Sequence, residues 1–163
     1  MLIILKNKDS LIVDDFIFKC VIGKNSIKTK KREGDKATPR GIFTLQKLYY
    51  RPDRSKKPKT KIPIRKIKKN MGWCDDPISK FYNKEIHINK KIRHEKLFRQ
   101  DSIYDYFIVI DYNLKKPMPN KGSAIFLHLT KRYKPTAGCI AIQKKDFEIL
   151  IKLIDQKTKI KIT

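Results

Sequence analysis

Short apolar runs separated by polar turns are the feature of this sequence that most restricts its fold. Residues 16–23, with the sequence FIFKCVIG, alternate like a strand and place Phe16, Phe18, Cys20 and Ile22 on one side. Comparable runs stand at 2–5, 11–13, 41–45, 104–111, 124–129, 138–142 and 159–162. A denser apolar pattern at 145–156 is typical of a mostly buried helix. The sequence therefore predicts a predominantly antiparallel β domain with one late helix and long loops.

The length of the chain favours a single domain spanning residues 1–163. Its 163 residues lie within the usual size of one domain, and neither an internal repeat nor a linker divides them. A chain of this size buries enough surface to form a core without disulfides or metals. Its longest apolar runs, such as 108–110 and 124–127, are far short of the roughly 18 residues of a transmembrane helix. We therefore expect no transmembrane segment, and a monomer.

The cysteines give no sign of a structural framework. Cys20, Cys74 and Cys139 are far apart and form no CxxC pair. This spacing predicts neither a disulfide framework nor a metal site. A lone cysteine is most often a small buried apolar residue, so any chemical role needs a separate argument.

A strong positive charge distinguishes the chain, with 40 Lys and Arg against 16 Asp and Glu and a formal net charge of +24. The densest basic run, at 54–69, contains two prolines, no acid and no aromatic side chain that could stack on a base. Such a run attracts any polyanion at low salt, but no recognisable nucleic-acid-binding motif surrounds it. We expect non-specific polyanion affinity and no specific nucleic-acid partner, with a basic binding module as an alternative function.

His128 and Cys139 are the two residues whose spacing could carry chemistry. His128 ends one predicted strand and Cys139 opens the next, so a loop could set them side by side on adjacent strands. The imidazole could then draw the thiol proton to form a thiolate–imidazolium pair, and the thiolate could attack an acyl carbon. Backbone N–H groups around Gly138 and Cys139 could hold the oxyanion. The spacing alone leaves open that both are ordinary core residues.

A more specific signal comes from three ordered blocks: GDKATPRGIF at 34–43, GWCDDP at 72–77 followed by Tyr82 and Asn83, and FLH at 126–128 followed by PTAGCI at 135–140. Together they resemble the L,D-transpeptidase catalytic domain of bacterial cell-wall enzymes, the YkuD-like family. The first matches its Thr-Pro-x-Gly-x-Phe signature, and the third its His and its Ser/Thr-x-Gly-Cys-Ile/Val core. The second is typical of a short, single-domain branch. The resemblance covers roughly residues 16–155.

The resemblance implies a mostly β, sandwich-like catalytic domain that needs no metal or organic cofactor. Cys139 would attack the bond after the third residue of a peptidoglycan stem peptide and release the terminal D-Ala. An acceptor amine or water would then resolve the acyl-enzyme, forming a cross-link or exchanging the terminal D-amino acid. His128 would be the general base, its other ring nitrogen held by the carbonyl of Leu129. Thr136 and Gly138 belong to the motif around the nucleophile.

Three positions depart from the pattern of many family members. Leu129 stands where Gly often follows the His, Ala137 where a His often precedes Gly-Cys, and Ala141 where Arg often follows Cys-Ile. The predicted nucleophile and base are intact. Because the missing Arg would help to position a stem carboxylate, an alternative is a hydrolase, an L,D-carboxypeptidase or endopeptidase, acting on the same peptides.

Five further residues are candidates for contact with the substrate. Tyr133 lies in the loop between base and nucleophile. Trp73 and Tyr82 could line the cleft or could cap the core. Asp75 could contact the free amine of a stem diamino acid, although capping a turn is commoner for an acid in this setting. Arg40, in a turn that enters a strand, could approach the substrate.

The sequence leaves the cellular location open. The usual substrate of the family lies outside the cytoplasmic membrane, which favours the periplasm or cell envelope. The chain begins MLIILK and shows no basic region, long apolar stretch and cleavage site of a secretory signal. A cytoplasmic location is therefore the alternative.

Overall fold

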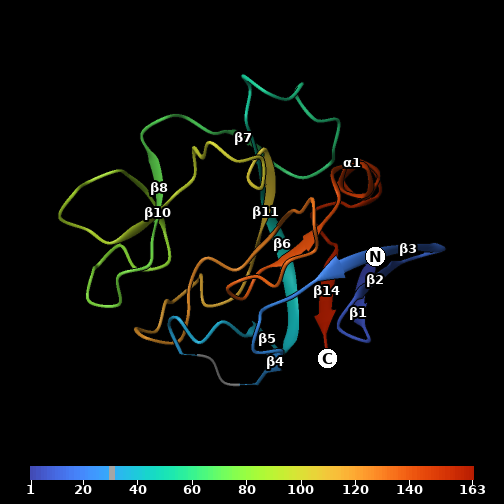
Figure 1. Cartoon of the computed structure of the whole chain (residues 1–163), viewed down its shortest axis with the longest axis horizontal. Helices are drawn as coiled ribbons and strands as arrows, with labels where there is room; N and C mark the ends of the chain where they lie inside the picture. The colour runs from blue at the N-terminus through green and yellow to red at the C-terminus, as the bar shows by residue number, and fades with distance from the viewer. Residues whose placement is uncertain (30–31) are drawn as a thin grey trace.

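A barrel-like sheet dominates the structure, a computed structural model that describes residues 1–29 and 32–163 (Figure 1). Nine strands pair in the order β11-β12-β13-β3-β2-β1-β14-β6-β7, and β11 also pairs with β6. They are β1 (Leu2–Lys6), β2 (Ser10–Val13), β3 (Phe16–Val21), β6 (Gly41–Tyr50), β7 (Ile64–Lys66), β11 (Tyr106–Ile110), β12 (Phe126–Leu129), β13 (Ile140–Ile142) and β14 (Lys159–Ile162). The predicted mainly β fold is confirmed. The sandwich-like arrangement is not, because the pairing of β11 with β6 closes the sheet into a ring.

The first three strands form a meander that follows the predicted alternation. Leu11 and Val13 are buried from β2, while β3 buries Phe18 and Cys20 on the same side. The turn between β1 and β2 places Asn7 and Lys8 at positive φ, the geometry that matches the twist of a two-stranded hairpin. Phe16 is 41% exposed, because it lies at the very start of its strand. The strands predicted at 2–5, 11–13 and 16–23 are therefore confirmed, with Phe16 outside the core.

Two smaller sheets lie beyond the barrel. The pair β4 (Ile27–Lys28) and β5 (Thr38–Pro39) is parallel, and the other sheet has the order β10-β8-β9. Its strands are β8 (Met71–Cys74), β9 (Glu85–His87) and β10 (His94–Lys96), and Figure 1 shows β8 and β10 well apart from α1 and the N-terminal strands. These three strands lie in a part of the chain where the sequence patterns predicted no strand. Strands of three or four residues are too short for polar and apolar residues to alternate visibly.

Helix α1 (Lys144–Leu153) covers the barrel with a single face. Phe147, Leu150 and Ile151 are buried, whereas Ile149 is 38% exposed. The Phe147 ring stacks on Tyr106 of β11 at 5.8 Å between centroids. The helix ends three residues earlier than the predicted 145–156, because the chain turns extended at Ile154. The helix is confirmed, but it is amphipathic rather than mostly buried.

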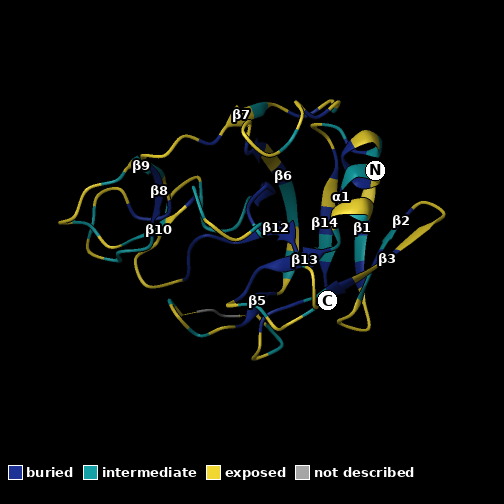
Figure 2. Ribbon diagram, turned by 45° about the horizontal axis from the view of Figure 1, so that its top comes forward, coloured by how far each residue is buried: buried dark blue, intermediate teal, exposed yellow. Residues whose placement is uncertain are grey.

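Strands β11, β12 and β13 are buried on both faces, as Figure 2 shows for β12 and β13. One face carries Leu127 and Ile140 into the main hydrophobic core with α1. The opposite face carries Phe107, Phe126 and Cys139 into a second cluster that is rich in aromatic rings. Side chains alternate across a strand, so residues on this second face point away from the main core. The candidate chemistry lies on this second face.

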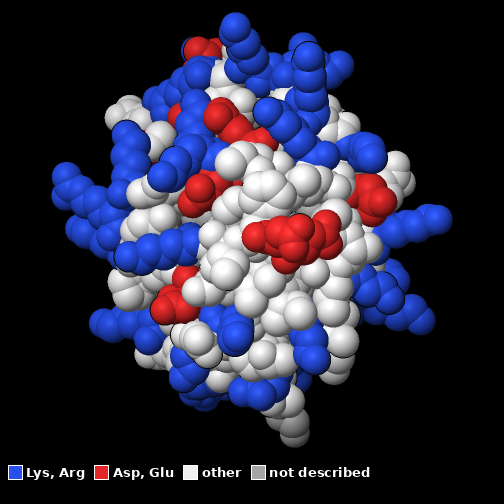
Figure 3. Space-filling view, turned by 90° about the vertical axis from the view of Figure 1, so that its right-hand side faces the viewer, with Lys and Arg blue, Asp and Glu red and all other residues white. Residues whose placement is uncertain are grey.

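Basic side chains are spread over the surface rather than gathered into one patch. On the face seen in Figure 3, Lys and Arg surround scattered acidic and uncharged residues. Among the residues that the structure describes, no helix is long and apolar enough to cross a membrane.

Candidate active site

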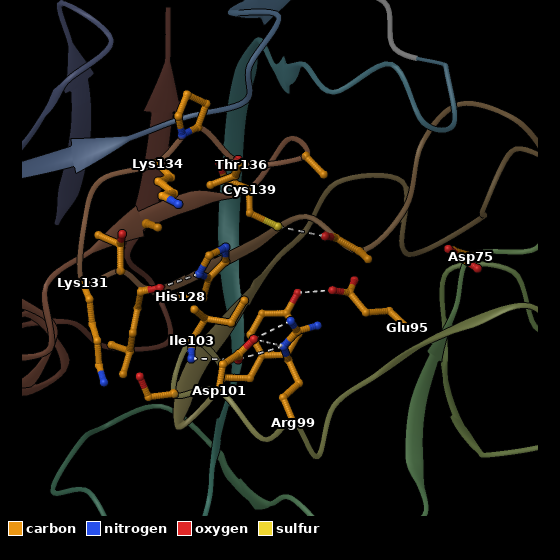
Figure 4. Close-up of a pocket in the computed structure, with 18 of the residues that line it drawn as sticks. Asp75, Glu95, Arg99, Asp101, Ile103, His128, Lys131, Lys134, Thr136 and Cys139 are labelled. Carbon is orange, nitrogen blue, oxygen red and sulfur yellow. Dashed lines mark hydrogen bonds and ion pairs between the residues drawn. The ribbon is translucent and has the colours of Figure 1, made fainter.

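A pocket of about 970 Å³ opens on the second face of the barrel sheet, between the barrel and the small sheet that contains β8 and β10. Its walls include Cys139 and His128 together with Asp75 and Glu95, and come from the segments 99–104, 122–124, 128–132 and 134–137. Figure 4 shows Cys139 and His128 on one wall of it. The pocket therefore joins the two predicted catalytic residues to segments far apart in the sequence.

Strand pairing sets Cys139 and His128 on the same face. Strands β12 and β13 are parallel, with His128 opposite Ala141 and Leu127 opposite Ile140. Cys139 directly precedes β13, two residues before Ala141, so its side chain shares the face of His128. Diagonal neighbours on adjacent strands lie close enough for long side chains to meet. The imidazole and the thiol are thus adjacent on the pocket wall, each less than 9% exposed.

The turn before Cys139 is held by Thr136. The Thr136 hydroxyl donates to the Cys139 carbonyl at 2.6 Å and accepts the Gly138 N–H at 3.1 Å. Gly138 has φ of +135°, a conformation that residues with a Cβ rarely adopt. This explains why a hydroxyl residue two positions before Gly suits the motif. The bond to the Thr136 hydroxyl also directs the Gly138 N–H, a predicted oxyanion donor, toward Thr136.

A buried contact from the start of the chain supports the same turn. The Thr38 hydroxyl accepts the backbone N–H of Gly23 at 2.9 Å, and Thr38 is fully buried. A Cβ added at Gly23 would lie 3.0 Å from the Gly138 Cα, which shows how closely the two backbones approach. The Thr-Pro signature therefore acts here as a brace behind the turn that presents Cys139.

The hydrogen bond of His128 determines which ring nitrogen carries the proton. Nδ1 lies 2.9 Å from the carbonyl oxygen of Leu129, and a carbonyl only accepts, so Nδ1 carries the hydrogen. Nε2 then has a free lone pair, and it has no hydrogen-bond partner among the residues that the structure describes. Burial, the largest cause, lowers the pKa of His128 to about 4. His128 is therefore a neutral base near pH 7.

The resting state of the pair follows from these contacts. The Cys139 Sγ–H donates to the Ala124 carbonyl at 3.2 Å, and Sγ accepts the Phe126 N–H at 3.3 Å. A lowered pKa of His128 disfavours the imidazolium, so the preformed thiolate–imidazolium pair of the sequence interpretation is not favoured here. The arrangement instead suits proton transfer during attack, with the Phe126 N–H placed to stabilise negative charge on sulfur.

The second sequence block supports the segment that faces the sulfur. Buried Asn83 accepts both the Trp73 indole N–H at 2.9 Å and the Ala124 N–H at 3.0 Å. The Tyr82 hydroxyl accepts the Gly122 N–H at 3.0 Å. These bonds hold Ala124 at φ +52°, with its carbonyl toward Cys139. Trp73 and Tyr82 are thus buried outside the pocket wall, which favours the alternative that they support the core over the alternative that they line the cleft.

Three other predicted substrate contacts fall differently. Asp75 lies on the pocket wall, where its carboxylate is paired with Arg93 at 3.1 Å. Tyr133 is outside the wall, because its ring lies under Lys19 of β3 at 4.8 Å. Arg40 is exposed and also outside the wall, where its N–H bonds to Lys28 across the β4–β5 pair. The positions of Tyr133 and Arg40 do not support direct contact with a molecule in the pocket.

Sequence reasoning missed a polar cluster beside His128. The buried Tyr104 ring packs edge-on against the imidazole at 5.4 Å, and its hydroxyl donates to Glu95. Arg99 and Asp101 form an ion pair on the same wall at 2.6 Å. Burial raises the pKa of Glu95. These residues lie in a stretch without periodicity. The clustering of charged and aromatic residues within a few positions is the signal that could have indicated them.

A solved structure resembles this chain along almost its whole length. The solved structure of Bdellovibrio bacteriovorus Bd1075 matches at 18% sequence identity and a TM-score of 0.48. The match covers 99% of this chain and 47% of the other, so this chain spans about half the length of that protein. The search of curated proteins gave no significant match.

A family model matches almost the whole chain. The family model described as YkuD, the L,D-transpeptidase catalytic domain, matches residues 2–162. That span contains all three sequence blocks, both residues on the pocket wall and every strand of the barrel sheet. The chain therefore belongs to the YkuD family of L,D-transpeptidase catalytic domains.

Proposed function

We propose that this protein is a cysteine acyltransferase, an L,D-transpeptidase that acts on peptidoglycan stem peptides. One observation carries the proposal: a thiol and a neutral imidazole with a free Nε2 lie together on the wall of one pocket. The family to which the chain belongs supports the choice of substrate. Because the usual substrate of the family lies outside the cytoplasmic membrane, we also propose that the protein acts in the periplasm or cell envelope.

The reaction follows from the two side chains. His128 Nε2 takes the Cys139 proton as sulfur attacks the carbonyl carbon after the third residue of the donor stem. The amide C–N bond breaks, the leaving D-amino acid takes the proton from His128, and a thioester remains on Cys139. An acceptor amine then loses its proton to His128 as it attacks the thioester carbon, the C–S bond breaks, and His128 returns the proton to sulfur, which restores the thiol. No step requires a metal or an organic cofactor.

Muropeptides and mass spectrometry test this proposal. Disaccharide tetrapeptides incubated with the protein should lose D-Ala and give dimers, or exchange D-Ala for an added D-amino acid. Cys139→Ala should abolish both, while Cys20→Ala, a substitution of a thiol on the opposite face, should not. Activity that persists in Cys139→Ala would remove the mechanism.

A carbapenem provides a test that needs no peptide. The thiolate should open the strained lactam by breaking its C–N bond, so the whole inhibitor adds to Cys139 as a thioester. Intact-mass analysis should show one adduct in the native protein and none in Cys139→Ala. An adduct located on Cys20 or Cys74 would count against the assignment.

Hydrolysis of the same peptides is the second candidate, and one observation favours it. Ala141 borders the pocket directly opposite His128, where many family members carry Arg. A site without that guanidinium has less to hold a stem carboxylate for transfer. Product analysis separates the two functions, because a hydrolase releases tripeptide or free stems without forming dimers.

A further inference from the structure

The outer surface of the barrel differs between its two halves. On β12 and β13 the outer face carries His128 and Ala141, which border the pocket. Ala141 pairs with Val21, so the same outer face continues onto β3 and from there onto β2, β1, β14 and β6. Around the ring, β1 is four strands from β12 in either direction. The outer face of β1 therefore lies on the far side of the barrel from the pocket, and Figure 1 shows the N-terminal strands well apart from β8 and β10.

A row of isoleucines crosses this far side of the barrel. In register across five neighbouring strands stand Ile17, Ile12, Ile4, Lys161 and Ile42. Partners in register point to the same face, and strands lie about 4.8 Å apart, so the row spans about 19 Å. The alternate residues of these strands fill the main core, which leaves the row on the outside. Ile17 is 71% exposed and Ile42 is 59% exposed.

The continuity of this row is what sets it apart. Single exposed apolar side chains are ordinary on a protein surface and need no explanation. Here they adjoin one another across the sheet, and Leu2, which is 42% exposed, extends the row along β1 from Ile4. Contiguous exposed apolar surface marks a place where a protein contacts another molecule. The row therefore indicates a docking surface.

The charge of these strands is entirely positive. None of the strands β1, β2, β3, β6 and β14 contains an acidic residue. Four of their lysines share the outer face with the isoleucines, namely Lys6, Lys19, Lys159 and Lys161. The neighbouring acids lie in the turns, with Asp9 between β1 and β2 and with Asp14 and Asp15 between β2 and β3. The sheet face thus combines an apolar row with basic side chains.

This combination distinguishes between three kinds of partner. A second copy of the chain would set the same lysines against one another, which is unfavourable for a chain of net charge +24. A nucleic acid would bind the lysines but would leave the isoleucines exposed to water. A bilayer with anionic lipids satisfies both, because apolar side chains enter the headgroup boundary while lysines meet the negative surface.

We propose that the outer face of β3, β2, β1, β14 and β6 binds the surface of a membrane that contains anionic lipids. We call this surface, with its isoleucine row and its four lysines, the lipid face. Because the lipid face lies opposite β12, the docked protein directs the pocket with Cys139 and His128 away from the bilayer. This inference goes beyond the proposed function and does not depend on it.

Vesicle sedimentation tests the apolar part of the lipid face. At about 0.15 M salt the native protein should bind vesicles with about 30% phosphatidylglycerol and should not bind pure phosphatidylcholine. The double variant Ile17→Ser with Ile42→Ser should bind the anionic vesicles about tenfold more weakly. Ile78→Ser, at a 94% exposed position outside these strands, should bind like the native protein. Absence of native binding, or equal binding by the double variant, would overturn the proposal.

Paired lysine variants test the charged part. Lys159→Gln with Lys161→Gln should weaken binding to the anionic vesicles by about tenfold or more. Lys57→Gln with Lys59→Gln removes the same charge from the basic run at 54–69 and should have a smaller effect. Equal losses from the two pairs would show attraction of the whole basic chain to a polyanion, and this would overturn the assignment to the lipid face.

A fluorescent probe tests insertion of the row itself. Ile17→Trp places an indole on the lipid face, whereas the native Trp73 is only 5% exposed and gives a constant background. Emission of Ile17→Trp should shift to the blue with anionic vesicles and should be quenched by brominated lipids, and Ile78→Trp should show neither change. A bound Ile17→Trp variant without either change would overturn the proposal. So would a dimer in light scattering that the Ile17→Ser and Ile42→Ser variant abolishes, because a second copy would then occupy the face.

Discussion

The core-facing and pocket-facing sides of β11, β12 and β13 are both buried, but they hold different kinds of side chain. Toward α1 the strands present Leu127, Ile140 and their aliphatic neighbours, which leave no polar atom to satisfy. Toward the pocket they present His128 and Cys139 among aromatic rings, with Nδ1 of His128 and Sγ of Cys139 directed to backbone partners and Nε2 of His128 left to act as a base. The core-facing side stabilises the fold by burying apolar side chains. The pocket-facing side of the same strands holds the reactive side chains in fixed positions.

The two thiols of this sheet give the largest expected contrast. Burial raises the pKa of Cys20, on the core side, to about 12. At pH 8 only about one Cys20 thiol in ten thousand is then ionised, and the thiolate is the reactive form. Iodoacetamide should therefore modify Cys139 in the native protein and reach Cys20 only in urea. Peptide mapping checks this, and early labelling of Cys20 would contradict the assignment of the two faces.

Substitution of the base on the pocket face should affect chemistry rather than folding. His128→Gln removes the Nε2 lone pair that accepts the thiol proton, so carbapenem acylation should slow by about 10²–10⁴-fold. The urea midpoint at pH 7.5 should change little. Stopped-flow acylation and equilibrium unfolding measure the two effects. A variant that acylates at the native rate would show that His128 is not the base.

The neighbouring residue on the core face should behave in the opposite way. Leu127 is fully buried, and Leu127→Ala should lower the free energy of unfolding by about 2–5 kcal/mol. Acylation per folded molecule should stay within a few-fold of the native rate. Urea denaturation with the same stopped-flow assay gives both values. A large loss of acylation without a loss of stability would contradict the assignment of stability to the core face and of chemistry to the pocket face.

The neutral state of His128 predicts how stability depends on pH. Its pKa of about 4 in the folded protein lies below its ordinary value of 6.5. As pH falls from 6.5 to 4, the unfolded chain binds a proton that the folded protein refuses, so folding weakens. The loss should reach about 3 kcal/mol near pH 4 and then level off. Urea unfolding of the native protein and of His128→Gln tests this, because only the native protein should lose that amount.

The smallest predicted effect probes the brace behind the nucleophile. At Gly23 an added Cβ would lie 2.6 Å from the Lys36 carbonyl oxygen and 3.0 Å from the Gly138 Cα. Gly23→Ala should cost about 1–3 kcal/mol of stability and displace the turn, which should slow acylation. A Cβ added at Gly34 would meet no atom within 4 Å, so Gly34→Ala is the comparison variant without a steric clash. Its φ of +75° still adds backbone strain. Native acylation in Gly23→Ala would show that this contact does not position Cys139.

Much of the β framework could be predicted from local pattern. The meander β1–β3 has one exposed face, so apolar and polar residues alternate and reveal its strands directly. Helix α1 was visible from its dense apolar pattern. The short strands of the β8–β10 sheet were missed, since three or four residues show no period. Closure of the ring by β11 and β6 was also invisible, because pairing between distant strands leaves no local mark.

The candidate site divides in the same way. The order of the motifs pointed to His128 and Cys139, because their residue types and the turn-forming Gly138 are local properties of the chain. The roles of Tyr82 and Asn83 were decided by hydrogen bonds to residues 122–124, some forty positions away, and Trp73 joins them through its bond to Asn83. The position of Glu95 beside the pocket was decided by Tyr104 and by the packing of the small sheet against the barrel.

By itself the sequence determined the strand-rich class, the order of the motifs and the pair of residues able to perform acyl transfer. Those properties depend on residue type and short-range period, which a chain carries before it folds. Only the tertiary structure decided which face of the doubly buried strands meets the pocket and that His128 is neutral. These depend on burial and on contacts between distant segments, and neither exists until the sheet has closed.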